Sequence, residues 1–219
     1  MAKLFDITGV LLAGGLSRRM GGGDKTLLDL DGRTIFEHVI ERVEGQVSRL
    51  ILNANGDPSR FQKFKGPIVL DSVAGNVGPL AGILSAMEWS EKNNPDCRWL
   101  ASFPTDAPFI PLDFVSALSA QIDPAETDIV CAKSLNRIHP PFAIWKISLK
   151  SDLRNALVDE GVRKIDDWTG RYKVVYVDFK GDGIDPFFNI NDRVSLEEAR
   201  KVFQNRLKGF AKGSSNECT

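Results

Sequence analysis

Apolar segments that predict strands alternate with segments of helical periodicity through the first half of this chain of 219 residues. The strand-like runs occupy residues 7–12, 49–53, 68–70 and 99–103. Helices are expected over residues 34–47, from residues 78–82 onward and from Pro111. Strands that are connected through helices pair in parallel, and the helices cover both faces of the sheet. The alternation therefore predicts an α/β fold with a parallel sheet between two helical layers.

The second half of the chain is less regular. Strands are expected on either side of residues 137–141, at 128–132 and 142–145, and again at 172–179. Helical segments are expected over residues 148–158, 162–168 and 195–207. No internal repeat or linker divides the sequence, so we expect a single domain over residues 1–208. Residues 209–219 are small and polar, which predicts a disordered tail.

Residues that can bind a ligand lie at or shortly after the ends of four of the predicted strands. These residues are Gly14, Asn53, Asp71 and Asp106. Ligands of parallel α/β sheets bind outside the carboxyl ends of the strands, so the four positions are expected at one binding edge. The amide of Asn53 can both donate and accept, as reading a base or a ribose requires. An asparagine at the end of a strand serves equally well as a plain turn residue.

The loop between the first strand and Lys25 is rich in glycine and in positive charge. Glycines let a loop adopt positive φ and bring backbone N–H groups close to a ligand. Successive N–H groups in such a loop form a concavity that binds anions. Arg18, Arg19 and Lys25 add cations beside the glycines. The combination predicts a polyphosphate site; the alternative is a surface loop that only turns the chain.

Two common phosphate-binding motifs do not fit this loop. A P-loop ends in Gly-Lys-Ser/Thr, whereas Asp24 precedes Lys25 here. The dinucleotide fingerprint G-x-G-x-x-G is absent as well, because Gly21 and Gly23 lead to Thr26. The loop therefore belongs to neither class.

Asp106 is a candidate ligand for Mg²⁺, which prefers oxygen ligands and is usually held by one or two carboxylates together with substrate phosphates. Alternatively, Asp106 only caps a turn; Asp71 either assists the metal or reads a base. No Ser-His-Asp or Cys-His arrangement is evident in the sequence. An attacking phosphate is already anionic and needs positioning and charge neutralisation more than a general base. Lys25, Arg19, the loop amides and Mg²⁺ can supply both.

The composition excludes several classes of protein. A net charge of −1 gives no overall field for nucleic acid or an anionic membrane. No apolar run approaches the roughly 20 residues that span a bilayer, and the N-terminus lacks the plan of a signal peptide. The three cysteines form no C-x-x-C pair, and we expect Cys97 and Cys131 to be small core residues. We therefore expect a cytoplasmic protein without nucleic-acid or membrane partners.

Several motifs together resemble one known family. The loop reads L-A-G-G-L-S-R-R-M-G-G-G-D-K over residues 12–25, and further matches lie at residues 53–55, 71, 78–82, 104–108 and 189–191. In these motifs the chain resembles the bacterial molybdenum cofactor guanylyltransferases of the nucleotidyltransferase superfamily. The resemblance covers most of the chain in order and is weakest at about residues 143–187.

The resemblance implies a three-layer α/β/α Rossmann-like nucleotidyltransferase fold with a mostly parallel sheet. It implies transfer of GMP from GTP to the terminal phosphate of molybdenum-molybdopterin, with release of pyrophosphate. The N-terminal half would bind GTP and the C-terminal half the acceptor. The implied GTP-binding residues are Leu12, Ala13, Gly14, Gly15, Lys25, Asn53, Asp71 and Asp106. The implied catalytic residues are Lys25, Asp106 and Arg19.

Other partners follow from the same resemblance. Asp106 would also hold Mg²⁺, and Asn189 and Asn191 would face the pterin. The protein would be a monomer that transiently contacts molybdenum-cofactor delivery proteins.

Two alternative functions stay open at this point. The chain could be another nucleotidyltransferase, acting on the same cofactor with CTP or on a sugar phosphate. Relatives that use CTP tend to carry alanine at the position of Gly14, so Gly14 and Gly15 favour guanine. A noncatalytic GTP-binding protein is the second alternative. Lys25 and Asp106 argue against it, because such a protein has no physical need for a metal carboxylate.

Overall fold

A seven-stranded sheet forms the centre of the computed structural model, which describes residues 6–14, 25–75 and 77–213, with side chains as far as residue 205. The strand order is β5-β4-β1-β6-β8-β7-β9, and every pair is parallel except those that β8 makes with β6 and β7. The strands are β1 (Ile7–Ala13), β4 (Arg49–Ala54), β5 (Ile68–Val69), β6 (Trp99–Pro104), β7 (Ile129–Ser134), β8 (Arg137–Lys146) and β9 (Val174–Asp178).

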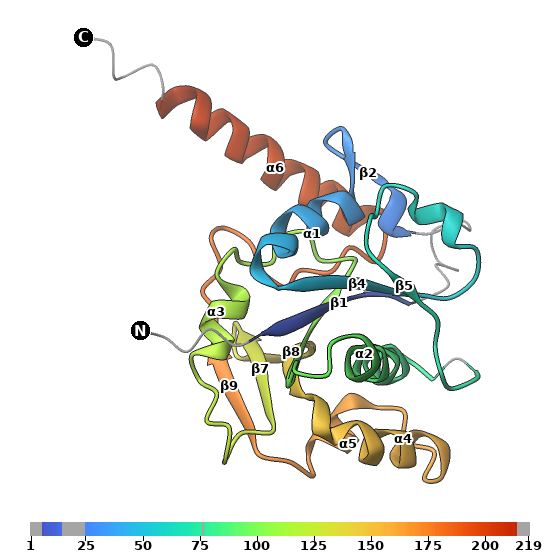
Figure 1. Cartoon of the computed structure of the whole chain (residues 1–219). Helices are drawn as coiled ribbons and strands as arrows, with labels where there is room; N and C mark the ends of the chain where they lie inside the picture. Colours follow the sequence, from blue (N-terminus) through green and yellow to red (C-terminus); the bar gives the residue numbers. More distant parts are fainter. Residues whose placement is uncertain (1–5, 15–24, 76, 214–219) are drawn as a thin grey trace.

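Helices cover both faces of this sheet. Figure 1 shows α1 above the sheet and α2, α4 and α5 below it. The helices are α1 (Ile35–Val43), α2 (Pro79–Asn93), α3 (Phe114–Ser119), α4 (Lys150–Val158), α5 (Ile165–Thr169) and α6 (Arg193–Gly213). Short 3-10 turns lie at η2 (Lys25–Leu27), η3 (Glu44–Gln46), η4 (Pro58–Phe61) and η5 (Ile147–Leu149). The expected three-layer α/β/α fold with a mostly parallel sheet is confirmed.

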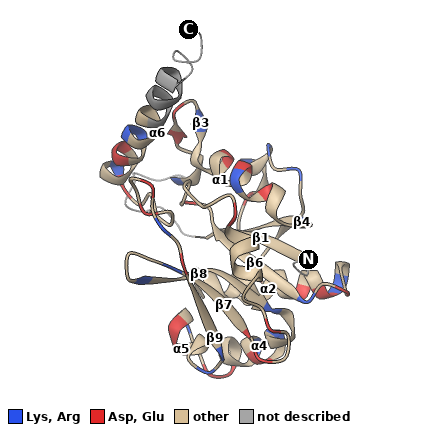
Figure 2. Ribbon diagram, turned by 90° about the vertical axis from the view of Figure 1, so that its left-hand side faces the viewer, with Lys and Arg blue, Asp and Glu red and all other residues tan. Residues whose placement is uncertain are grey.

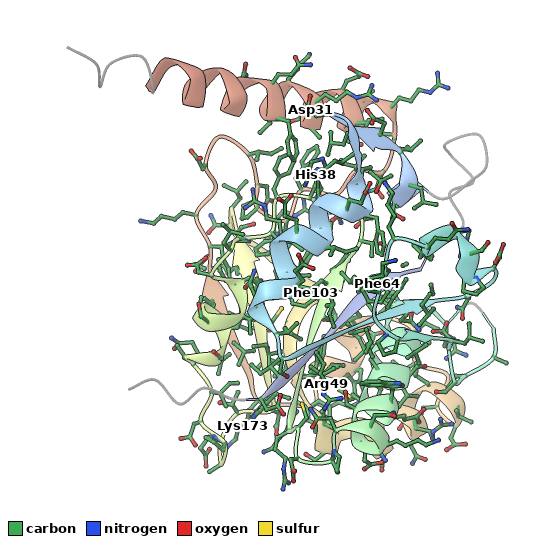
Figure 3. All side chains as sticks on the ribbon, turned by 45° about the horizontal axis from the view of Figure 1, so that its top comes forward. Asp31, His38, Arg49, Phe64, Phe103 and Lys173 are labelled. Carbon is green, nitrogen blue, oxygen red and sulfur yellow. The ribbon has the colours of Figure 1, made fainter. Side chains whose placement is uncertain are left out.

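Core side chains of the strands point alternately to the two faces of the sheet. On β1, Val10 and Leu12 pack toward the layer of α2, while Leu11 packs toward the layer of α1. Strands that are apolar on both faces belong between two helical layers. On the α1 side, Phe103 of β6 contacts Phe114 of α3 with ring centroids 5.5 Å apart, and Figure 3 labels Phe103 within this layer.

The β7–β8 hairpin differs from the expectation for this region. Residues 137–141 were expected to separate two strands, but they are the first half of β8. The hairpin turns at Leu135 and Asn136, which have φ of 46° and 60°. A two-residue turn with positive φ matches the twist of an antiparallel pair. Because leucine rarely adopts this conformation, the sequence carries little signal for the turn.

The C-terminal helix is longer than expected. A small hairpin of β2 (Asp29–Leu30) and β3 (Arg33–Thr34) lies beside its N-terminal part. Helix α6 continues to Gly213, so residues 209–213 of the expected tail are helical rather than disordered. Helical propagation is favourable once a packed first half has formed the nucleus. Residues 214–219 of the expected tail lie outside the described residues.

Helix α6 carries charges of both signs along the part nearest the body of the protein (Figure 2). Among the described residues, no helix combines the length and the apolar character needed to cross a membrane.

Cys97 and Cys131 are buried and unpaired, as expected, and burial raises the pKa of the Cys131 thiol to about 12.

Candidate functional site

The carboxyl edge of the sheet brings the ends of β1, β4 and β6 together. Leu12 of β1 lies opposite Asn53 on one side and opposite Pro104 on the other. Its carbonyl oxygen accepts hydrogen bonds from the backbone N–H and the hydroxyl of Thr105, at 3.3 and 3.2 Å. The residues after β4 and β6 are therefore fixed on either side of Leu12, Ala13 and Gly14, where the glycine-rich loop begins. Gly15 and Arg19, which were expected in the site, lie outside the described residues.

Lys25, Asp106 and Asn191 form a group beside this edge, although Asn191 is 166 residues from Lys25 in sequence. The ammonium Nζ of Lys25 lies 2.6 Å from Oδ2 of Asp106 and 2.5 Å from Oδ1 of Asn191. Both charged side chains are only 16% exposed. A largely desolvated cation in this position can bind a phosphate more strongly than an exposed lysine can.

The segment that carries Asn191 is fixed to Asp106 through the backbone. Ile190 donates its N–H to the carbonyl oxygen of Asp106 at 2.9 Å, and its side chain is fully buried. Asp192 then caps the start of α6 by accepting a hydrogen bond from the N–H of Ser195 at 2.8 Å. Bonds from the backbone and hydroxyl of Ser195 hold the pKa of Asp192 below its usual value. The neighbouring Asn189 is exposed and makes no hydrogen bond to Lys25 or Asp106.

A second group, Asn53, Asp71 and Asn55, lies at the ends of β4 and β5. Asn53 is buried and donates its Nδ2 to Oδ1 of Asp71 at 2.9 Å and to the carbonyl of Val69 at 3.2 Å. Asn55 donates to Oδ2 of Asp71 at 2.7 Å and accepts from the backbone N–H of Asp71 at 3.0 Å. Both carboxylate oxygens of Asp71 are therefore held by amide donors.

Asn55 was not expected from the sequence as a site residue. The signal for it was the Asn-x-Asn spacing at the end of a strand, because residues two positions apart point to the same face.

Gly82 lets helix α2 approach this second group. A Cβ at Gly82 would lie 2.3 Å from Oδ1 of Asn53, which is shorter than any real contact of this kind. The close approach brings the first turns of α2 against the amide of Asn53. Unpaired backbone N–H groups give a helix N-terminus a partial positive charge, which favours anions nearby.

The Asp106 side fits a divalent cation. Its Oδ1 is buried and has no hydrogen-bond partner among the described residues, while Oδ2 binds Lys25. A buried carboxylate oxygen without a partner is costly and is a natural metal ligand. Within the described ranges, no group of three His, Cys, Asp or Glu side chains forms a metal cage. A single carboxylate of this kind suits a divalent cation that is also held by substrate phosphates and water.

Comparison with known proteins decides the family. Residues 9–174 match the model of the MobA-like NTP transferase domain. The chain belongs to this family. A molybdenum cofactor guanylyltransferase of Bradyrhizobium sp. strain ORS 278 is 44% identical over 196 residues, covering 90% of this chain and 92% of the relative. One from Rhodopseudomonas palustris is 44% identical over 194 residues, covering 88% and 92%.

A solved structure shares the fold of this MobA-like chain. Molybdopterin-guanine dinucleotide biosynthesis protein A from Archaeoglobus fulgidus superposes with a TM-score of 0.72 at 23% identity, covering 90% of this chain and 99% of that one. The matched family domain contains Lys25, Asn53, Asp71 and Asp106, whereas Asn191 lies beyond its last matched residue. The site thus joins the family domain to a C-terminal segment.

Proposed function

We propose that this chain is a molybdenum cofactor guanylyltransferase, which transfers GMP from GTP to molybdenum-molybdopterin and releases pyrophosphate. The names of the relatives at 44% identity support this activity. The structural observation that carries the proposal is the meeting of a cation, a carboxylate with a buried unpartnered oxygen and an amide at Lys25, Asp106 and Asn191. These groups have the charges that two reacting phosphates require.

The second group binds the nucleoside end of GTP in this proposal. Asn53 and Asp71 offer donor and acceptor atoms whose directions are already fixed by mutual hydrogen bonds and by Asn55. Preorganised polar groups give specificity because a wrong base leaves them unpaired. Leu12, Ala13 and Gly14 then run between the nucleoside end and the phosphate end.

The reaction itself needs little covalent participation by the protein. The terminal phosphate of the acceptor attacks the α-phosphorus of GTP, a P–O bond forms, and the bond to the β-phosphate breaks as pyrophosphate leaves. Lys25 has three N–H donors and stabilises the charge on the phosphates. Asp106 would hold Mg²⁺ through its unpartnered Oδ1, and the ion would supply further charge neutralisation when bound. Asn189 and Asn191 would face the pterin of the acceptor, which remains a prediction.

Pyrophosphate release with Mg²⁺, each nucleoside triphosphate in turn and molybdenum-molybdopterin as acceptor tests the activity. Release that needs both GTP and the acceptor is expected. Release with CTP instead would make the chain a cytidylyltransferase, and binding of GTP without release would place it among noncatalytic GTP-binding proteins. Either of these results would refute the proposal.

An isosteric variant tests the role of Asp106. Asp106→Asn keeps the volume but removes the charge of the proposed metal ligand, so turnover should fall by about 10²-fold or more. Asp113→Asn is the matched control, because Asp113 is exposed at the start of α3 and makes no capping bond. Equal activity of the two variants would remove Asp106 from the mechanism.

A further inference from the structure

A further polar cluster lies apart from the groups around Lys25 and Asn53. It is bonded to the segment that leads to Asn191. The hydroxyl of Ser134 lies 2.7 Å from Nε2 of His139 and 2.7 Å from Oδ1 of Asp185. Ser134 is fully buried, and the side chains of His139 and Asp185 are only 12% and 16% exposed. The imidazole packs against the ring of Phe187, with centroids 4.9 Å apart.

The geometry of this cluster excludes a nucleophilic serine. In a catalytic triad the acid binds one ring nitrogen of histidine while the serine binds the other. Here Asp185 approaches the same Nε2 that contacts Ser134, at 3.9 Å, and also accepts the hydroxyl proton of Ser134. A hydroxyl that is fully buried cannot reach a substrate. The cluster is therefore a fixed polar network, and such networks specify one local arrangement when their members are satisfied.

The cluster is anchored to the rigid β7–β8 hairpin. Ser134 is the last residue of β7, and His139 lies on β8 opposite Ala132. The two residues therefore cannot shift independently of the sheet. Asp185, by contrast, belongs to the connection between β9 and α6. The hydroxyl of Ser134 thus joins this connection to the sheet.

Between Asp185 and the candidate site the chain is held by a series of hydrogen bonds from backbone N–H groups. Oδ1 of Asp185 also accepts the N–H of Phe187 at 2.9 Å, and its carbonyl oxygen accepts the N–H of Phe188 at 3.0 Å. The N–H of Ile190 then binds the carbonyl oxygen of Asp106 at 2.9 Å. The next side chain, Asn191, contacts Lys25.

We infer that Ser134, His139 and Asp185 are positioning residues that fix residues 185–191, and thereby place Asn191 and the Ile190 amide against Lys25 and Asp106. The inference deepens the proposed function and rests on it for any effect on catalysis. The inference also gives a role to β8, which is antiparallel to its neighbours. The β7–β8 hairpin carries Ser134 and His139, which hold residues 185–191 in place. Small misplacements of such supports lower rates by up to about 10²-fold.

Hydrogen–deuterium exchange of the full-length, ligand-free chain tests the positioning without any assumption about activity. In Ser134→Ala, peptides that cover residues 185–191 should exchange about tenfold faster, while β1 and β4 keep their protection. Asp185→Ala should behave in the same way. Asp185→Asn retains an oxygen for both bonds and should restore most of the protection. Tyr172→Phe is the control, because it removes only a hydroxyl that binds Asp152 on the opposite helical layer.

Kinetics of the same variants separates positioning from general damage. We expect kcat to fall about tenfold in Ser134→Ala while KM for GTP rises by clearly less than kcat falls, because the hydrogen bonds that fix Asn53 and Asp71 do not involve residues 185–191. Unchanged exchange in Ser134→Ala, or faster exchange throughout the chain, would overturn the inference. A rise in KM for GTP that matches the loss of kcat would also overturn it. If the unmodified chain releases no pyrophosphate, the proposed function fails, while the exchange experiment still decides the positioning role.

Discussion

Replacing Gly82 with alanine should weaken both the fold and the binding of GTP, because this position touches the buried amide of Asn53. A Cβ at Gly82 would lie 2.3 Å from Oδ1 of Asn53 and 2.9 Å from a methyl carbon of Leu12. Neither partner has room to withdraw, since both are buried, and Asn53 is also hydrogen-bonded to Asp71. Either the amide or the first turn of α2 must therefore move.

Two opposing contributions set the size of the effect. Additional atoms in a close-packed region cost about 1–3 kcal/mol. Alanine in place of glycine inside a helix favours folding by about 0.8–1 kcal/mol. The net destabilisation should therefore be about 1 kcal/mol, which lowers Tm by about 2–4 °C in a domain of this size. Loss of the hydrogen bond between Asn53 and Asp71 should weaken GTP binding by about tenfold, equivalent to about 1.4 kcal/mol.

Thermal unfolding and calorimetric titration with GTP measure the two effects on the same samples. Gly45→Ala is a matched control, because a Cβ at Gly45 meets nothing within 4 Å and the position has no positive φ. This control should keep its GTP affinity and gain about 0.4–1 kcal/mol in stability. If Gly82→Ala is as stable as Gly45→Ala and binds GTP as tightly, the close approach of α2 does not hold the site and the reasoning fails.

Three further predictions concern the charge state of single residues. Lys25→Met should raise KM for GTP about tenfold and lower kcat, because the phosphates lose a desolvated cation, and steady-state kinetics with unchanged constants would contradict this. Burial holds the pKa of His139 below its usual value of 6.5, so the unfolded chain binds more protons than the folded chain. The free energy of unfolding, measured with urea, should therefore fall as the pH drops below about 6.5. His139→Gln should make this pH dependence weaker. The Cys131 thiol, with its pKa raised to about 12, should resist a thiol reagent at pH 8 in the folded protein and react after unfolding. If the folded protein is labelled rapidly and a Cys131→Ser variant is not, the thiol is not buried.

The sheet was predictable from the sequence because its strands and helices follow patterns that are local in the chain. The apolar run of β1 and the glycines after it indicate both a strand and a binding edge within a few residues. The β7–β8 hairpin was missed because Leu135 and Asn136 lack the Asn-Gly or Asp-Gly signature of such turns. The extension of α6 past residue 207 was missed because it follows from propagation of a packed helix rather than from an apolar stripe.

The candidate site was predictable in its parts but not in its connections. Asn53 lies at the carboxyl end of β4 and Asp106 follows β6, so the topology alone places them at one edge. The contact of Asn191 with Lys25 has no counterpart in the local sequence, because tertiary packing of Ile190 brings it there. The link from Ser134 to Asp185 joins residues 51 apart and was invisible for the same reason. The binding roles of the individual residues remain predictions.

The distance in sequence between Lys25 and Asn191 also affects the order in which the protein becomes complete during synthesis. Lys25 and Asp106 leave the ribosome early, whereas Asn191 follows only when most of the chain has been made, and the Ser195 turn that begins α6 comes later still. Contacts of such long range form late, because the intervening chain must be ordered first. A nascent chain therefore holds the matched family domain before Asn191 can reach Lys25.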